Sequence, residues 1–469
     1  MPQSWVVAAD PPVHDLEALG WLQFQRLCDV LLERCAGVPA DAWTGEADGL
    51  RWAVAPEGLG PPLVARALPG PTLVLTRFRR RGTEPLPVEV PAPEPSPTSL
   101  VLLTTVPSSS EAEPAAAGHE LPPADVAVLG PAELGAAIAA RPDVRLALPS
   151  VLGVVDAATL VDEAVAGRST LDLPAAAALA RVFVPTRAYA RAVRALAQHR
   201  FAVLTGPPET GKTAIARMLA LARMTDGWEA HECTAPEQVF ARFDVRRRQV
   251  FVADDAFGST EYRPDAAERW ARDLDRVLAR LDDRHELVWT SRPAPLRAGL
   301  RRLHRERGLE RFPLPGEVQV DAAALDVEEK VLILFRHARA AEVGPDAVRV
   351  LQAEGRTIVE HPHFTPERIR RFVAGRLPEL ATGDRARRRI DLLDAIEGEL
   401  ERPTAAMATS FGALEPEHRA VLVAMLDAPG PPVHERDLTH ALRRHHPGGL
   451  SHPPVELVDR LADHFVRVL

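Results

Sequence analysis

The sequence predicts an α/β protein of several domains with a parallel sheet at its centre. Its 469 residues exceed one ordinary domain and suggest about three or four. Between Phe201 and Ser291, apolar runs of strand length alternate with runs of helical spacing, an order typical of a parallel sheet with helices on both faces. After about Pro315 only helical patterns follow.

The region of residues 1–150 predicts a separate, smaller α/β domain. Apolar residues recur at helical spacing over residues 13–36. Residues 84–98 are rich in Pro and Glu and cannot pack as a helix interior. The Ala-rich residues 151–182 predict a helical connector. Strand-like runs are expected at Thr72–Phe78, Leu100–Thr105 and Asp125–Leu129, after a short apolar stretch at Leu50–Ala55 and before a helix at Pro131–Ala140.

Residues 183–315 predict the domain that contains the parallel sheet. In such a sheet the carboxyl ends of the strands meet at one edge, where ligands bind. The expected strands are Phe201–Thr205, Trp228–Cys233, Gln249–Asp254 and Glu286–Ser291. The expected helices are Lys212–Arg223, Pro236–Arg242 and Ala266–Asp282.

Residues 316–402 predict a helical lid domain, and residues 403–469 a winged-helix domain. The latter has three helical runs and then a short apolar segment, Phe465–Leu469, which is the element order of a winged helix. It has no concentrated basic face, so we expect it to regulate the central domain and not to read DNA. The expected lid helices are Asp326–Glu342, Ala347–Glu354, Pro366–Arg376 and Asp384–Leu400.

Composition narrows the classes of function. The net charge of −9 and the pI of about 6.0 argue against nucleic-acid binding through overall charge, although a local basic face is compatible with them. The three cysteines form no CxxC pair, which indicates neither a disulfide framework nor a zinc site. The first residues lack a signal-peptide pattern, and no apolar run reaches the roughly 18–20 residues of a membrane span. We therefore expect a cytoplasmic protein without a membrane partner.

A phosphate-binding motif lies between the first strand and the first helix of the central domain. The segment Gly206-Pro-Pro-Glu-Thr-Gly-Lys-Thr213 matches G-x-x-x-x-G-K-[ST] in full. Lys and Arg together number 56, yet the chain contains only two lysines, Lys212 and Lys330. A loop wrapped around phosphate takes a compact ammonium and not a flat guanidinium. The sequence thus predicts a nucleoside triphosphate site, with a fortuitous glycine turn as the alternative.

Each part of this motif has a chemical role. The two glycines let backbone N–H groups point at the phosphates, and the following helix adds its positive end. Lys212 would contact the β- and γ-phosphates, and the Thr213 hydroxyl would ligate Mg²⁺. The residues predicted to contact nucleotide are Gly206, Pro207, Pro208, Glu209, Thr210, Gly211, Lys212, Thr213 and Ala214.

Polar residues follow two further strands. Asp254 ends the run Gln249–Asp254 and Asp255 follows it; Asp254 would bind the metal, and Asp255 would orient or deprotonate the attacking water. A solvated turn is the plainer interpretation of two adjacent Asp. Thr290, Ser291 and Arg292 end the next strand, where a hydroxyl or Arg can sense the γ-phosphate. An ordinary surface arginine is an equally weighted alternative for Arg292.

These residues resemble the STAND class of P-loop ATPases, within the ASCE division, and in particular the novel STAND families of bacterial proteins. The resemblance covers about residues 183–469. It is carried by Phe183-Val-Pro-Thr186, the loop GPPETGKT, the strand VFVADDAFG, the segment WTSRP, His361-Pro-His-Phe-Thr-Pro366 and the winged-helix-like C-terminal stretch.

The resemblance implies ATP or ADP with Mg²⁺ as cofactors. Val184 and Pro185 would line the adenine pocket, and Pro366 would lie in the lid over the nucleotide. It implies Thr213 and Asp254 as metal residues, and Lys212, Asp255 and Arg292 as catalytic ones. Glu209 departs from the pattern, since Gly or another small residue is commoner there. Its negative charge near the phosphates is unfavourable for efficient turnover.

The same resemblance implies a nucleotide-dependent switch that hydrolyses ATP slowly and forms a homo-oligomer on activation, in bacterial signalling or defence against phage. The sequence does not distinguish ATP from GTP. Two rival functions stay open. One is an ATP-dependent restriction-type enzyme that cleaves or binds DNA, and the other is a scaffold that holds nucleotide without turning it over.

Residues 1–150 resemble a restriction-endonuclease-like domain of the Mrr type, through the first helix, Ala47-Asp48-Gly49 and the later strands. Active members place an acid in that helix, an Asp near Asp48 and a Gln/Glu-x-Lys on the next strand. Here Gln25 and the segment Arg77-Phe-Arg79 replace two of these elements. One carboxylate is too few to hold a catalytic cation, so we expect a nuclease fold without nuclease activity. A divergent active enzyme is the alternative, and DNA stays a partner that the sequence allows but does not favour.

Overall fold

The computed structural model describes residues 14–80, 96–106, 125–258, 264–300, 315–377 and 414–461, apart from a few positions within these ranges, together with some isolated residues between them. The chain divides into two compact units. The first comprises Met1–Val161 and Ala177–Phe183, and the second comprises Asp162–Ala176 and Val184–Leu469.

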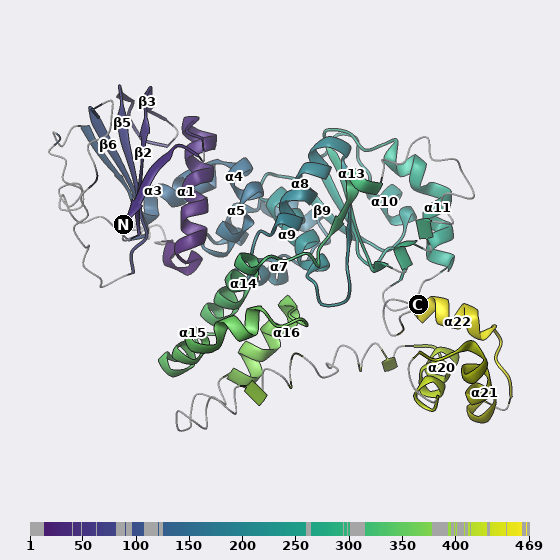
Figure 1. The fold of residues 1–469 in the computed structure, drawn as a ribbon. Coiled ribbons are helices and arrows are strands. Elements are labelled where there is room, and N and C mark those ends of the chain that lie inside the picture. Colours follow the sequence, from purple (N-terminus) through teal and green to yellow (C-terminus); the bar gives the residue numbers. More distant parts are fainter. Residues whose placement is uncertain are drawn as a thin grey trace, which may run out of the picture. The chain divides into compact units, whose positions relative to one another are not determined.

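The first unit contains a five-stranded mixed sheet in the order β1-β2-β5-β6-β7. Neighbours are antiparallel from β1 to β5 and parallel from β5 to β7. Strands β2, β5 and β6 of this sheet are labelled in Figure 1. The strands are β1 (Trp43–Ala47), β2 (Leu50–Ala55), β5 (Thr72–Arg77), β6 (Ser99–Thr104) and β7 (Val126–Leu129), with a small pair β3 (Gly58–Leu59) and β4 (Leu68–Pro69). The helices are α1 (Trp21–Ala36), α3 (Pro131–Ala140) and α4 (Pro142–Ala147).

The predicted helix over 13–36 is wrong in its first part. Residues Leu16–Leu19 form a 3₁₀ turn, η1, and α1 begins only at Trp21. Gly20 between them has φ +75°, a left-handed conformation that interrupts the helix. Strand β1, which pairs with β2, was not predicted from the sequence.

The connector consists of short helices and not of one long helix. They are η3 (Pro149–Gly153), α5 (Ala157–Leu160), α6 (Glu163–Arg168) and α7 (Leu173–Ala180). Asp156 and Asp162 accept backbone N–H bonds at the starts of α5 and α6. Such side-chain caps favour new helix starts over continuation.

The second unit contains a five-stranded parallel sheet in the order β12-β8-β11-β10-β9. The strands are β8 (Phe201–Thr205), β9 (Glu229–Cys233), β10 (Gln249–Ala253), β11 (His285–Ser291) and β12 (Gln319–Asp321). The helices are α8 (Arg187–His199), α9 (Lys212–Met224), α10 (Pro236–Arg242), α11 (Pro264–Leu278) and α13 (Pro315–Val318). The expectation of no strand after Pro315 is therefore wrong, because β12 joins the sheet beside β8.

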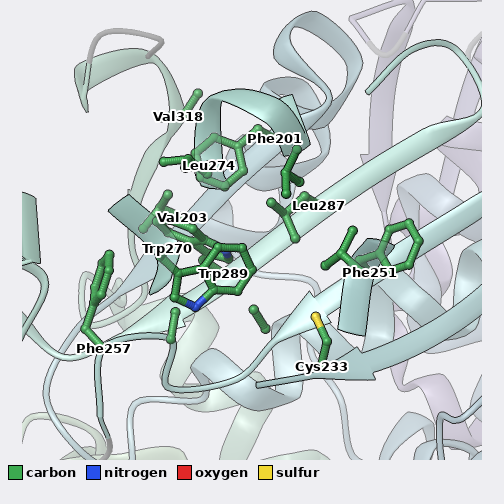
Figure 2. Packing of buried hydrophobic residues seen from close by; sticks show 14 of the residues in the cluster. Phe201, Val203, Cys233, Phe251, Phe257, Trp270, Leu274, Leu287, Trp289 and Val318 are labelled. Atoms are coloured by element: carbon green, nitrogen blue, oxygen red, sulfur yellow. The ribbon is translucent and has the colours of Figure 1, made fainter. Parts of the chain in front are cut away.

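One face of this sheet carries a large aromatic core. Trp289 on β11 packs edge-on against Trp270 of α11, at 4.8 Å between ring centroids, and against Phe201 and Phe257 (Figure 2). All four rings are fully buried. Because the residue after Trp289 is Thr290, this packing fixes the end of β11, which reaches the candidate site.

The remaining described part of the second unit is helical. The lid region contains α14 (Val327–Ala340), α15 (Pro345–Val359), α16 (Pro366–Arg371) and a π-helical turn, η4 (Phe372–Arg376). The C-terminal helices α20 (Pro416–Leu426), α21 (Glu435–His445) and α22 (Pro454–Leu461) share one apolar core. Most of the helix expected at Asp384–Leu400 and of the segment Phe465–Leu469 lies outside the described residues.

Among the described residues, no helix is both long enough and apolar enough to span a membrane.

Candidate functional site

The phosphate-loop motif connects β8 to α9, at the carboxyl edge of the parallel sheet. Gly211 has φ +91° and immediately precedes α9. A Cβ on Gly206 would lie 2.9 Å from Thr210 Oγ1, so a side chain does not fit there. The Thr210 hydroxyl in turn donates to the carbonyl of Pro207 at 2.9 Å. The loop is thus curled back on itself, as its glycines predicted.

Lys212 lies inside this curl. Its Nζ donates to the carbonyl of Pro207 at 2.7 Å, and the residue is 7% exposed. Burial lowers the pKa of Lys212 to about 8, while the charge of Asp255 opposes the shift. The ammonium is therefore partly desolvated, which strengthens its attraction for an anion.

Asp254 lies where the ends of two strands and the start of a helix meet. It directly follows β10, whose last residue, Ala253, pairs with Trp289 of β11. Thr213 at the start of α9 donates its hydroxyl to Asp254 Oδ1 at 3.0 Å. Thr290 on β11 donates its hydroxyl to the same oxygen at 2.5 Å. The carboxylate is thereby fixed from two sides.

Asp255 is held by the same threonine. Its backbone N–H donates to Thr290 Oγ1 at 2.8 Å, so one hydroxyl joins both acids. Asp255 has φ +48°, a left-handed conformation that costs energy for any residue but glycine and least for Asn and Asp. Burial, followed by the charge of Asp254, raises the pKa of the Asp255 carboxyl to about 6.

The charge of Arg292 interacts with the charge of Asp255. Its charge lowers the pKa of Asp255, and the charge of Asp255 raises that of Arg292 against the lowering effect of burial. The structure therefore brings together Lys212, Asp254, Asp255 and Arg292, which lie far apart in the sequence.

The side chains of this cluster are of the kinds that bind a nucleotide together with Mg²⁺. Mg²⁺ is usually held by one or two carboxylates together with substrate phosphates and water. Thr213 and Asp254 supply one hydroxyl and one carboxylate, already in contact. Among the described residues, no group of three or more His, Cys, Asp or Glu side chains forms an all-protein metal site.

The lid region approaches the loop through Pro366. Its Cγ would lie 3.9 Å from a Cβ on Gly211, so Pro366 faces the phosphate loop. Val184 is buried and Pro185 is half-buried, directly before Thr186, which caps α8 by accepting the N–H of Tyr189 at 3.3 Å. Pro208 and Ala214 are half-buried parts of the loop and of α9.

The expectation about Glu209 needs correction. The sequence predicts an added, unpaired negative charge near the phosphates. In the structure its carboxylate is paired with two arginines of α16, Arg368 at 3.2 Å and Arg371 at 3.0 Å. No sequence signal indicates these partners, since the chain is rich in arginine and they lie about 160 residues away.

Asp321 was also missed, because β12 is only three residues long. Its Oδ1 lies 3.6 Å from the position that a Cβ on Gly206 would occupy, beside the phosphate loop. Thr290 was recognised as part of a polar strand end, but its contact with both acids could not be predicted. That contact depends on the register of β10 with β11.

In the first unit, Gln25 is buried on α1 and donates from Nε2 to Glu46 Oε1 at 3.1 Å. Arg77 is buried on β5. Asp48 lies outside the described residues. Of the residues compared with a nuclease centre, the structure therefore describes Gln25 and Arg77 but not Asp48.

The five-stranded parallel sheet, the curled loop and the acid-bearing strand ends define the class of a P-loop NTPase. Residues 183–340 match the family model described as Novel STAND NTPase 3. Together these observations support a nucleotide-binding NTPase of the STAND type in this part of the chain.

Solved structures with some likeness include the Walker-type ATPase PABY2304 of Pyrococcus abyssi, at 14% identity and a TM-score of 0.35, covering 60% of this chain and 89% of that chain. The FIGL-1 AAA domain in complex with ADP is 14% identical with a TM-score of 0.30, covering 53% and 88%. PCH-2 of C. elegans is 14% identical with a TM-score of 0.28, covering 61% and 80%. No curated protein matches the sequence.

Proposed function

We propose that this protein is a nucleotide-dependent molecular switch that binds ATP or ADP with Mg²⁺ and hydrolyses the triphosphate slowly. The observation that carries the proposal is that Thr213 and Thr290 both donate hydrogen bonds to Asp254. A hydroxyl and a carboxylate of the kind that ligate Mg²⁺ thus lie near Lys212 and Asp255. The most direct test is to identify, by chromatography, the nucleotide that the purified chain carries.

The roles follow from the chemistry of each group. Backbone N–H groups of the loop and the ammonium of Lys212 bind the phosphates, and Thr213 and Asp254 hold the Mg²⁺, which offsets phosphate charge when bound. Asp255 accepts a proton from the attacking water, and Arg292 stabilises charge that develops on the γ-phosphate. Val184 and Pro185 contact the base, and Pro366 covers the nucleotide from the lid.

The pH dependence of kcat/KM is expected to be bell-shaped. Asp255 must be deprotonated to act as a base, and its raised pKa of about 6 puts the acidic limb there. Lys212 must be protonated to attract phosphate, and its lowered pKa of about 8 puts the alkaline limb there. Phosphate release measured from pH 5 to 9 checks both limbs. An acidic limb near pH 4 would contradict the raised pKa of Asp255 that burial and the charge of Asp254 cause.

Replacing Thr290 with valine is expected to lower turnover by about tenfold to a hundredfold, because loss of the hydroxyl frees both acids from their positions. Valine keeps the shape and β-branching of threonine, so the sheet is retained. Thr290→Ser retains the hydroxyl and is expected to stay within a few-fold of wild type. Wild-type phosphate release by Thr290→Val would exclude this positioning role.

For the whole chain, we propose a restriction-endonuclease-like first domain (1–150) without nuclease activity, a connector (151–182), the NTPase domain (183–315), the lid (316–402) and a C-terminal winged helix (403–469). Activation in bacterial signalling or phage defence would involve a homo-oligomer. Light scattering with ADP and with a non-hydrolysable triphosphate tests the oligomer. Mg²⁺-dependent plasmid cleavage that is lost in Asp48→Ala would instead favour a DNA-cleaving enzyme.

A further inference from the structure

An ion-pair cluster connects the phosphate loop to the lid. Glu209 of the loop accepts from Arg368 Nε at 3.2 Å and from Arg371 Nη2 at 3.0 Å. The two arginines lie three residues apart on α16, so they share one face of the helix. One carboxylate therefore holds the same helix at two successive positions.

The cluster is largely shielded from water. The side chain of Glu209 is 8% exposed, and those of Arg368 and Arg371 are 14% and 19% exposed. Screening by solvent and salt weakens an exposed pair but much less a buried one. Removal of one partner from a buried pair leaves the other charge uncompensated, which is strongly unfavourable. This contact is thus of a different kind from the many exposed ion pairs of the chain.

The backbone at Glu209 is strained. It has φ +67°, a left-handed conformation that is uncommon outside glycine. A glycine at this position would relieve the strain but would remove the carboxylate. Strain of this kind persists where the surrounding contacts enforce it, and it often marks a switch or a ligand clamp. The residue with this backbone is the one whose carboxylate pairs with Arg368 and Arg371.

The arginines also connect to other parts of the helical region. Arg368 donates to the carbonyls of His363 and Leu400, and Arg371 contacts Glu367 at 3.3 Å. Alongside the ion pairs, Pro366 faces Gly211. Displacement of α16 from the loop would therefore disturb the segments on both sides of that helix.

We propose that Glu209, Arg368 and Arg371 form a latch that holds the lid helix α16 on the phosphate loop. Separation of α16 from the loop requires the carboxylate and both guanidinium groups to part and become solvated. The latch belongs to the chain itself, so it restrains α16 before any ligand arrives. It rests on the proposed function in one respect, namely that a nucleotide in the loop leaves only when α16 moves away, so the latch sets the rate of nucleotide release.

The latch is tested first without added nucleotide, by hydrogen exchange of backbone amides in residues 366–376. Glu209→Gln is expected to raise the exchange rate about tenfold because it removes both ion pairs, and Arg371→Gln by a smaller factor because Arg368 stays paired with Glu209. The double variant is expected to exchange no faster than Glu209→Gln, which already removes both contacts. Arg370→Gln is the matched control, since Arg370 lies on the same helix but pairs with Glu367. Unchanged exchange in Arg371→Gln, or additive effects in the double variant, would overturn the latch.

Two further measurements separate the latch from local damage and from the proposed function. Glu209→Gly removes the carboxylate but relieves the backbone strain, so it is expected to speed exchange at α16 as Glu209→Gln does while lowering the unfolding temperature less than Glu209→Gln. Release of a fluorescent ADP analogue is expected to become about tenfold faster in Glu209→Gln and Glu209→Gly but not in Arg370→Gln. If the wild type binds no nucleotide, the proposed function fails, and the exchange experiment still decides the latch.

Discussion

Replacing Lys212 with alanine is expected to weaken nucleotide binding by at least about a hundredfold, or about 2.7 kcal/mol, and to abolish measurable turnover. The reason is the position of the ammonium inside the curled loop, 2.7 Å from the carbonyl of Pro207 and shielded from water. A desolvated cation binds phosphate more strongly than an exposed one does. Calorimetry with ATP and Mg²⁺ measures the change.

Two variants sharpen this test. Lys212→Arg keeps the charge but replaces a compact ammonium with a planar fork, so we expect it to fail nearly as completely as alanine. Lys330→Ala is the control, because the other lysine packs over the ring of Phe364, 5.3 Å from its centroid, and not in the loop. Wild-type affinity in Lys212→Ala would contradict the placement of the phosphates in this loop.

Replacing Asp255 with asparagine is expected to lower turnover by about 10²- to 10⁴-fold while nucleotide affinity changes by only a few-fold, because asparagine cannot accept the proton of the attacking water. Asparagine also suits the site structurally. It tolerates the left-handed backbone at φ +48° and keeps the N–H that donates to Thr290. Single-turnover phosphate release and calorimetry separate the two effects.

The control for this variant lies at the opposite edge of the same sheet. Asp283 is exposed just before β11 begins, whereas Asp255 follows the far end of β10. Asp283→Asn is therefore expected to leave turnover unchanged. Equal phosphate release by Asp255→Asn and wild type would assign the protein to the class of scaffolds that hold nucleotide without hydrolysing it.

The local parts of the site could be predicted from the sequence. The strands β8 to β11 appear within a residue or two of their predicted limits, because strand-length segments alternate regularly with segments of helical spacing, and β8 and β10 are apolar throughout except at one end. The loop from Gly206 to Thr213 has the curl that its glycines demand. The acids Asp254 and Asp255 follow a buried strand, so their place at the sheet edge was fixed by the parallel order.

Other features depend on contacts between distant segments. The three residues of β12 are too few for a periodic signal, and they form a strand only because β8 offers an open edge. Thr290 reaches Asp254 and Asp255 because Ala253 and Trp289 are paired in register, a relation that no motif encodes. The break at Gly20 was missed because the helical spacing of apolar residues continues across it.

By itself, the sequence determined the class of site: a phosphate loop with its lysine, and two acids at a strand end, because these depend on local backbone geometry and on a regular alternation of strands and helices. Only the tertiary structure shows which side chains neutralise the charged groups of the loop and orient the two acids. Glu209 reads as an isolated charge in the sequence and is a paired one in the fold. The physical reason is that ion pairing and burial are set by the packing of α16 on the loop, across about 160 residues of chain.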